Sequence, residues 1–219
     1  MLQAINRFRI LFLDHTAKLG GGEIALVNLI RCLDRRRYEP IVILFADGPL
    51  RHELEAENVK VFVVPLKESL GNARKDGLGA RSLFRLGDVL TACGFVWRLR
   101  SMIRQCQPDI VHTNSLKSHL LGGAAVKLAG LPLVWHMRDR IAEDYLPRKV
   151  VWVVRNLCRW LPDRIIANSH ATLATLGPSF ADDAPGAGQR HRACVVHDGT
   201  AVRPLLQNPS SSQGISCNL

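Results

Sequence analysis

The chain alternates between short, almost uninterrupted apolar runs and segments whose apolar residues recur at helical spacing. The first apolar run is FRILFLD, residues 8–14, and the segment after it places Ile24, Val27 and Ile30 on one helical face. A strand that is apolar throughout is typically buried on both faces, as in a parallel sheet. These two segments therefore predict a buried strand followed by a helix that packs on the sheet.

The same alternation continues to residue 199. We expect further strands within residues 40–46, 59–65, 109–115, 131–139, 163–169 and 193–199. We expect helices within residues 49–57, 81–106, 116–130, 143–161 and 171–177. Strands and helices that alternate at this spacing form right-handed βαβ units. The predicted fold class is therefore α/β, a Rossmann-like, doubly wound parallel sheet of seven strands in a single domain.

Three stretches break this periodicity. Residues 66–80 contain glycine and asparagine breakers among mixed charges, and residues 178–192 are rich in Pro, Gly and Asp, so both are predicted loops. From residue 200 onward a serine cluster and two prolines stand where periodic apolar residues would be, which predicts disorder. We expect a domain over residues 1–199 and a disordered or aberrant tail over residues 200–219.

Composition and charge narrow the class of protein. The 219 residues are 47% hydrophobic, and the formal net charge is +10. No apolar run is long enough to span a membrane, and the N-terminus makes a poor signal peptide because its apolar run is short, so we expect a cytoplasmic protein. The positive charge suits nucleic acid, anionic lipid or phosphate-bearing substrates. Nucleic acid is not expected, because the sequence has no motif of a nucleic-acid-binding module.

Motifs of the common catalytic and metal-binding sites are absent. The sequence has no GxSxG, HExxH or DxD-like pattern, and its six cysteines form no CxxC pair. We therefore expect no metal and no cofactor. His15, beside the glycines that follow the first strand, is a candidate acid or base, although a lone histidine is weak evidence.

Three glycines, Gly20, Gly21 and Gly22, stand between the first strand and its helix. Glycines there expose backbone amides at a helix N-terminus, which suits phosphate or another anion. The spacing fits neither GxGxxG nor the P-loop, so neither a dinucleotide site nor an NTPase is indicated. A tight turn without a ligand remains an equal alternative.

Polar residues follow three of the predicted strands, and open α/β sheets bind ligands at the carboxyl ends of their strands. Single residues at such positions also serve as helix caps, so Ser115, Asn168 and Ser169 have this alternative explanation. The candidate substrate-binding residues at these ends are His112, Asn114, Ser115, Arg138, Asp139 and Asn168, with His136 beside them.

The predicted helix 143–161 has two faces. The apolar stripe consists of Leu146, Val150, Val153, Leu157 and Leu161, and Arg148, Trp152, Arg155 and Arg159 recur on another face. Arginine interleaved with tryptophan suits an anionic membrane surface. The alternative is a solvated basic face with a buried tryptophan.

Four segments, taken in order, resemble the N-terminal domain of GT-B glycosyltransferases of the family-four type. They are ILFLDHTAKLGGGEIALVNLIRCL, PDIVHTNSLKSHLLGGAAVKLAGLPLVWHMRD, DRIIANSHATLATL and VVHDGT, and they cover about residues 8–200. One departure concerns the strand that the family usually ends with a histidine followed by Asp. Arg138 stands in the place of that histidine, and His136 lies two residues earlier, so the histidine's role does not carry over directly.

The resemblance implies a two-domain enzyme that uses a nucleotide-activated sugar. The N-terminal half would chiefly bind the acceptor, a glycan or lipid-linked glycan at the cytoplasmic face of the membrane. Gly20–Gly22 would border the interdomain cleft, and Arg138 and Asp139 would face the acceptor or the donor. The E-x7-E motif of the donor-binding half is missing, so the chain is expected to be inactive alone. Two alternatives stay open: a non-catalytic binding subunit that needs a separate donor-binding chain, and another Rossmann-type nucleotide-binding protein, which the missing GxGxxG disfavours.

Overall fold

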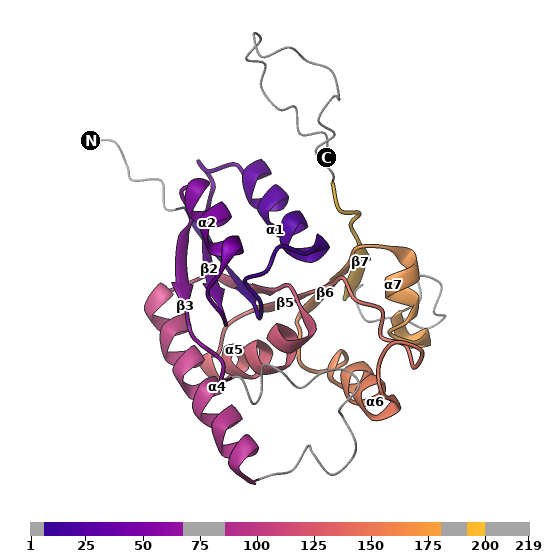
Figure 1. Ribbon diagram of the computed structural model, residues 1–219. Coiled ribbons are helices and arrows are strands. Elements are labelled where there is room, and N and C mark those ends of the chain that lie inside the picture. Colours follow the sequence, from indigo (N-terminus) through magenta and orange to yellow (C-terminus); the bar gives the residue numbers. More distant parts are fainter. Residues whose placement is uncertain (1–6, 68–85, 181–191, 200–219) are drawn as a thin grey trace, which may run out of the picture.

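The computed structural model describes residues 7–67, 86–180 and 192–199, and within them the chain forms a parallel sheet with helices on both faces (Figure 1). Seven strands lie in the order β3-β2-β1-β4-β5-β6-β7, and every neighbouring pair is parallel. Their bounds are β1 Phe8–Asp14, β2 Tyr38–Leu44, β3 Lys60–Val63, β4 Ile110–Thr113, β5 Leu133–Met137, β6 Arg164–Ala167 and β7 Ala193–Val195. This confirms the predicted fold class.

The helices connect successive strands. They are α1 Gly21–Cys32, α2 Pro49–Ala56, α4 Leu86–Cys106, α5 Gly123–Ala129, α6 Arg148–Leu157 and α7 His170–Ala174, with a π-helical turn η2 at Ser118–Gly122 and a 3-10 turn η3 at Pro178–Phe180. Among the described residues, no helix is long and apolar enough to cross a membrane.

The two faces of the sheet bury separate apolar clusters, because alternate residues of a strand point to opposite faces. On one face, Phe12 packs with the α1 residues Leu26 and Ile30. On the other face, Leu11 and Leu13 belong to a larger cluster that α4, α5 and α6 cover. Figure 1 shows α1 and α2 on one side of the sheet and α4, α5 and α6 on the other. The burial of both faces explains why the strands are apolar at consecutive positions.

The predicted strands are confirmed, although most are shorter than the expected segments. Only β1 has the expected bounds, and the polar residues that end the segments 109–115, 131–139, 163–169 and 193–199 lie beyond the strands. The predicted loop beyond residue 67, the start of α4 before residue 86, the loop at 181–191 and the tail at 200–219 lie outside the described residues, so those expectations stay predictions.

Helix α6 is shorter than the expected 143–161. It begins after Pro147, which caps it, because proline disfavours helical geometry in the residue before it. The expected apolar stripe is wrong at Val153, which is exposed, and it missed Val151, Val154 and Cys158, which are buried. The other expected residues, Leu146, Val150, Leu157 and Leu161, are buried or pack against the core.

Candidate functional site

Side chains at the carboxyl ends of β1, β4 and β5 meet at one edge of the sheet. These strands are adjacent, and the chain leaves β1 toward β2 on one side while β4 pairs on the other. Such a reversal of strand order is where open α/β sheets bind ligands. The edge is therefore the first place to look for a site.

Asp14, the last residue of β1, is fully buried. One carboxylate oxygen accepts from Asn114 Nδ2 at 2.8 Å, and the other accepts from Ser115 Oγ at 3.1 Å. Burial by itself would raise the pKa of Asp14, but hydrogen bonds from the His15 and Asn114 side chains outweigh it and hold this pKa below its usual value. The carboxylate is therefore anionic and supplies a fixed negative charge under the site.

His15 joins this cluster instead of standing alone. Its Nδ1 lies 2.7 Å from Ser115 Oγ and 3.5 Å from an oxygen of Asp14. Ser115 Oγ is in turn 3.0 Å from Ser118 Oγ. The imidazole remains about one-third exposed, with 32% of the side chain accessible. This ring is thus oriented by two buried groups and open to solvent, an arrangement suited to moving a proton.

Arg138 extends the cluster across the sheet edge. Its Nε donates to Asn114 Oδ1 at 2.8 Å, and its Nη1 pairs with Asp198, in the segment after β7. The side chain is only 8% exposed. A Cβ on Gly22 would lie 3.3 Å from Arg138 Cδ, a tight contact to which the Arg138 side chain would have to adjust. A continuous chain of polar contacts thus runs from Asp14 through Asn114 and Arg138 to Asp198.

Three histidines are buried beneath this chain. His112 Nε2 lies 3.1 Å from His136 Nδ1, and His119 Nδ1 lies 2.7 Å from Thr113 Oγ1. Burial, with the neighbouring positive charge of Arg138, lowers the pKa of His136 to about 3, and burial together with His112 lowers the pKa of His119 to about 3. The pKa of His112 is also lowered, chiefly by burial. All three rings are neutral at pH 7.

The structure brings together five of the predicted site residues: Gly22, His112, Asn114, Ser115 and Arg138. The sequence did not single out Asp14 or Asp198, which hold the two ends of the chain of contacts. An aspartate closing an apolar strand was a usable signal for Asp14. No comparable signal marks Asp198, because its partner lies 60 positions away.

The other predicted residues make different contacts. Gly20 N donates to Glu23 Oε2 at 3.1 Å, so α1 caps its own N-terminus, and Gly21 is exposed beside it. Asp139 accepts from the Tyr145 hydroxyl at 3.5 Å, and Asn168 Oδ1 accepts from Thr172 Oγ1 at 2.8 Å. No hydrogen bond among the described residues joins these side chains to Arg138.

The basic face of α6 is smaller than predicted. Arg148 is exposed and pairs with Glu143, and Trp152 is 69% exposed, which excludes the alternative of a buried tryptophan. Arg155 does not belong to a solvated face, because its guanidinium donates to the backbone oxygens of Thr175 and Ile141. It holds the loop before α6 and the end of α7 together.

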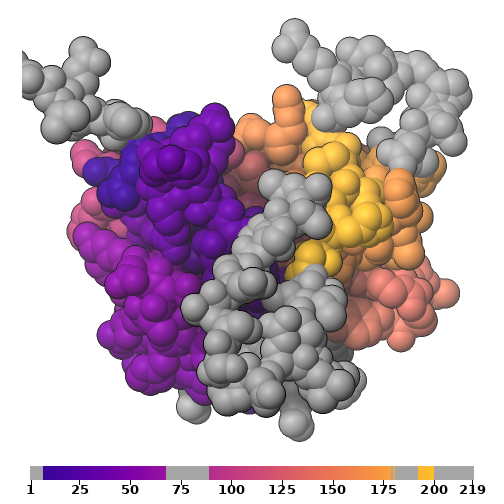
Figure 2. Space-filling view, turned by 90° about the horizontal axis from the view of Figure 1, so that it is seen from above, coloured from indigo at the N-terminus to yellow at the C-terminus, as the bar shows by residue number. Residues whose placement is uncertain are grey.

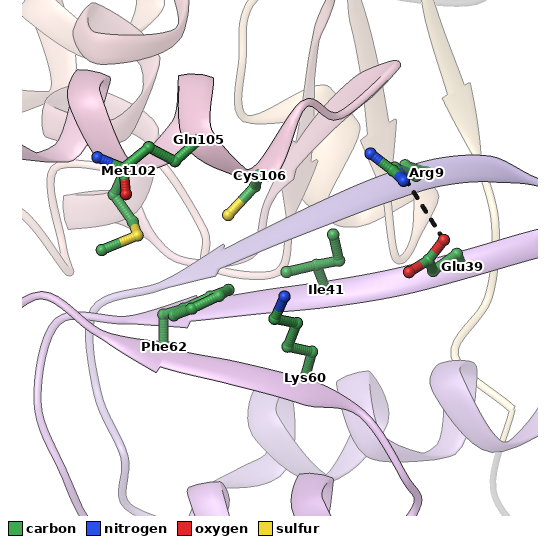
Figure 3. A pocket seen from close by; sticks show the side chains of 8 residues that line it. All are labelled: Arg9, Glu39, Ile41, Lys60, Phe62, Met102, Gln105 and Cys106. Carbon is green, nitrogen blue, oxygen red and sulfur yellow. Dashed lines mark ion pairs between the residues drawn. The ribbon is translucent and has the colours of Figure 1, made fainter.

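A cavity of about 330 Å³ lies away from this cluster (Figure 3). It is lined by Arg9, Glu39, Ile41, Lys60, Phe62, Met102, Gln105 and Cys106, which come from the amino ends of β1–β3 and the end of α4. The only charged pair within it, Arg9 and Glu39, is half-exposed, with a separation of 3.4 Å. Among the described residues, no group of three or more His, Cys, Asp or Glu side chains could hold a metal ion.

The amino-acid sequence matches a known protein family and a curated relative. A family model described as Glycosyltransferase Family 4 matches residues 19–181, more than half of the chain. A curated relative, the UDP-Gal:alpha-D-GlcNAc-diphosphoundecaprenol alpha-1,3-galactosyltransferase of Escherichia coli, is 26% identical over 156 residues. That match covers 71% of this chain and 35% of the relative.

Solved structures agree with this match. Anabaena Alr3699/HepE, in complex with UDP and glucose, superposes with a TM-score of 0.62 and 25% identity over 89% of this chain and 45% of that one. A UDP-N-acetylglucosamine 2-epimerase superposes with a TM-score of 0.59 at 14% identity, over 93% of this chain and 53% of that one, which shows a shared fold alone. The chain thus spans less than half the length of the Escherichia coli galactosyltransferase and of Alr3699/HepE.

Proposed function

Because the chain belongs to glycosyltransferase family 4, we propose that it supplies the acceptor-binding half of a glycosyltransferase. The reaction would transfer a sugar from a nucleotide-sugar donor to a glycan or lipid-linked acceptor. A second half, on the same or a separate chain, would bind the donor. The name of the Escherichia coli relative gives a lipid-linked diphosphate, GlcNAc-diphosphoundecaprenol, as its acceptor. The structure of Alr3699/HepE is a complex with UDP and glucose.

The observation that carries this proposal is the polar chain from Asp14 to Asp198 at the carboxyl edge of the sheet. Buried polar groups are costly to keep in a fold unless they are fully paired, and a sheet of this kind does not need them there. The chain links the ends of β1, β4 and β5 to the segment that follows β7. In the space-filling view, residues 192–199 (yellow) lie at the surface, across this face from the purple N-terminal elements (Figure 2). A substrate bound at this edge would touch side chains from several strands at once.

Joining the chain to a donor-binding half tests the proposal. The purified chain alone should give no product with labelled UDP-sugars and a prenyl-diphosphate-linked acceptor, because transfer needs donor and acceptor held at reacting distance. Fusion to the donor-binding half of a family-four relative should restore transfer, and Asn114→Ala in the fusion should lower it at least tenfold. Turnover by the chain alone, or a fusion that binds donor and never transfers, would contradict the proposal.

We also propose that the protein is cytoplasmic and peripheral at the inner face of the membrane. Trp152 and Trp160 are 69% and 82% exposed, and Arg148 and Lys149 are exposed beside Trp152. The residues Arg148 and Trp152 are one helical turn apart, so a cation and an aromatic ring face the same way. This pairing suits anionic headgroups, for which each nearby cation contributes about 1 kcal/mol.

Vesicle co-sedimentation tests this surface. The chain should bind vesicles that contain anionic lipid. This binding should weaken as salt is added, and it should weaken severalfold in the double variant Arg148→Ala, Lys149→Ala. Trp152→Ala should weaken binding by a part that salt does not change. Trp97→Ala is the matched control, because Trp97 is equally exposed, at 64%, on α4 instead of α6. Unchanged binding of folded α6 variants would show that α6 is not the membrane contact.

A further inference from the structure

The Nε2 atom of His136 is buried and has no hydrogen-bond acceptor among the described residues. Its Nδ1 lies 3.3 Å from Arg138 Nη2, and a guanidinium can only donate, so Nδ1 is the acceptor. The hydrogen of the neutral ring is therefore on Nε2. Among the described residues Nε2 has no hydrogen-bond partner, although His136 is only 4% exposed. An unpaired buried N–H is costly and uncommon in native proteins.

Two donors converge on one carboxylate oxygen. Arg138 Nη1 bonds to Asp198 Oδ1, and His136 Nε2 lies 3.9 Å from that same atom, too far for a hydrogen bond. Arg138 is fixed from behind by Asn114, which Asp14 holds in turn. The pair of donors is thus rigidly placed, while Asp198 lies three residues beyond the end of β7.

We propose that Arg138 and His136 form a subsite for a phosphoryl group of a diphosphate, and that the Asp198 carboxylate occupies this subsite in the free domain. A phosphoryl group offers several oxygens around one centre, so it can satisfy the guanidinium and the Nε2 donor together, as Asp198 does not. This inference rests on the proposed function, in which donor and lipid-linked acceptor both carry diphosphate.

Local charge requires that Asp198 leaves when the anion binds. Two carboxylates are tied to Arg138: Asp14, which is fully buried and linked to it through Asn114, and Asp198, which pairs with it directly and is one-third exposed. A diphosphate beside both would add a third negative group to a single guanidinium. Departure of Asp198 removes one of these negative charges, so the ligand and Asp198 compete for the same guanidinium. Substrate binding would thereby release the Asp198 side chain from Arg138, while Val196 stays bonded to Ala167 of β6.

Calorimetry with inorganic pyrophosphate on the 219-residue chain tests this competition directly. The isosteric variant Asp198→Asn removes the competing charge and should bind pyrophosphate about tenfold more tightly than the wild type. Arg138→Gln should abolish binding, and Arg138→Lys should retain only part of it because the planar fork is lost. Arg140→Gln is the matched control, because Arg140 is exposed two positions away and pairs with Asp144. Melting curves confirm that each variant is folded.

If folded Asp198→Asn binds no more tightly than the wild type, or folded Arg138→Gln binds equally well, the subsite is overturned. Binding of UDP and of a short-chain prenyl diphosphate then distinguishes the donor from the acceptor. The ligand whose diphosphate occupies the subsite should show the larger increase in affinity on Asp198→Asn. These measurements need no sugar transfer and no donor half. A failed fusion experiment would therefore leave this result standing, and a failed binding experiment would leave the proposed function standing.

Discussion

The two ends of the parallel strands carry polar residues of very different character. At the amino end, a cavity is lined by Arg9, Glu39 and Lys60 among others. The ion pair between Arg9 and Glu39 is partly exposed. At the carboxyl end, Asp14 and Asn114 are buried and bonded to partners on neighbouring strands. The cavity of about 330 Å³ lies at the amino end, yet the buried, directed hydrogen bonds lie at the carboxyl end. Directed, buried hydrogen bonds therefore identify a candidate site here better than the size of a cavity does.

The largest effect should come from removing the charge under the carboxyl end. Asp14→Ala removes the charged acceptor of two buried hydrogen bonds, those of Asn114 Nδ2 and Ser115 Oγ, which should cost about 3–5 kcal/mol of unfolding free energy. Urea denaturation measures it. The control is Asp109→Ala at the amino end, where the exposed carboxylate accepts only from Arg9 N among the described residues, and the loss should stay within about 1 kcal/mol. Equal losses would erase the contrast between the two ends.

Acid should destabilise the carboxyl end next. His119 and His136 have pKa values of about 3 when folded, whereas unfolded histidine titrates near pH 6.5, so the unfolded chain binds more protons in acid. Stability is therefore complete above about pH 6.5 and declines as the pH falls toward 3, by roughly 1.4 kcal/mol per histidine for each unit.

From pH 7 to 5.5, protonation of the two rings in the unfolded chain should lower the free energy of unfolding by about 3 kcal/mol. Urea denaturation across this pH range would measure the loss. His119→Phe keeps a ring against Trp135 and removes one titrating group, so its stability should depend less steeply on pH. A slope identical to that of the wild type would show that His119 is not buried in its neutral form.

A smaller loss is expected where a helix approaches the carboxyl end most closely. A Cβ at Gly122 would lie 2.8 Å from Leu13 Cδ1 and 3.6 Å from Thr113 Cγ2. Gly122→Ala should therefore destabilise by about 1–3 kcal/mol through overpacking. Gly94→Ala in α4 meets nothing within 4 Å and should stabilise by up to about 1 kcal/mol. Thermal unfolding of the two variants, shifted in opposite directions, would confirm the difference.

The smallest effect should come from the amino end itself. Glu39 lies 3.4 Å from Arg9 Nε and 3.7 Å from Arg7 Nη2, and all three side chains are partly exposed. Glu39→Gln should change the unfolding free energy by less than about 1 kcal/mol, and less again in high salt. A loss as large as that of Asp14→Ala would mean that the cavity end is organised as strongly as the site.

The sequence was sufficient for the sheet, because apolar strands and helical spacing are local properties. It also located the carboxyl ends, and Asn114, Ser115 and Arg138 meet there as predicted. What it missed depends on contacts between distant segments. The pairing of Arg138 with Asp198 and the role of Arg155 in fixing two loops have no trace in local periodicity. Pro147 makes α6 begin at Arg148 instead of residue 143. The helical pattern was read over the whole expected range, 143–161, and did not reveal this later start.

The pairing of β1 with β4 has a consequence for the order in which the domain assembles. Leu11 lies beside Val111, one hundred positions away, whereas β1–β2 and β4–β5 pair across far shorter separations. Closing a long loop costs more chain entropy than closing a short one, and distant pairings slow folding. Each half of the sheet can form from its own neighbours before the two halves join. The contacts of Asp14 with Asn114 and Ser115 cross that junction, so the candidate site is complete only once the two halves have joined.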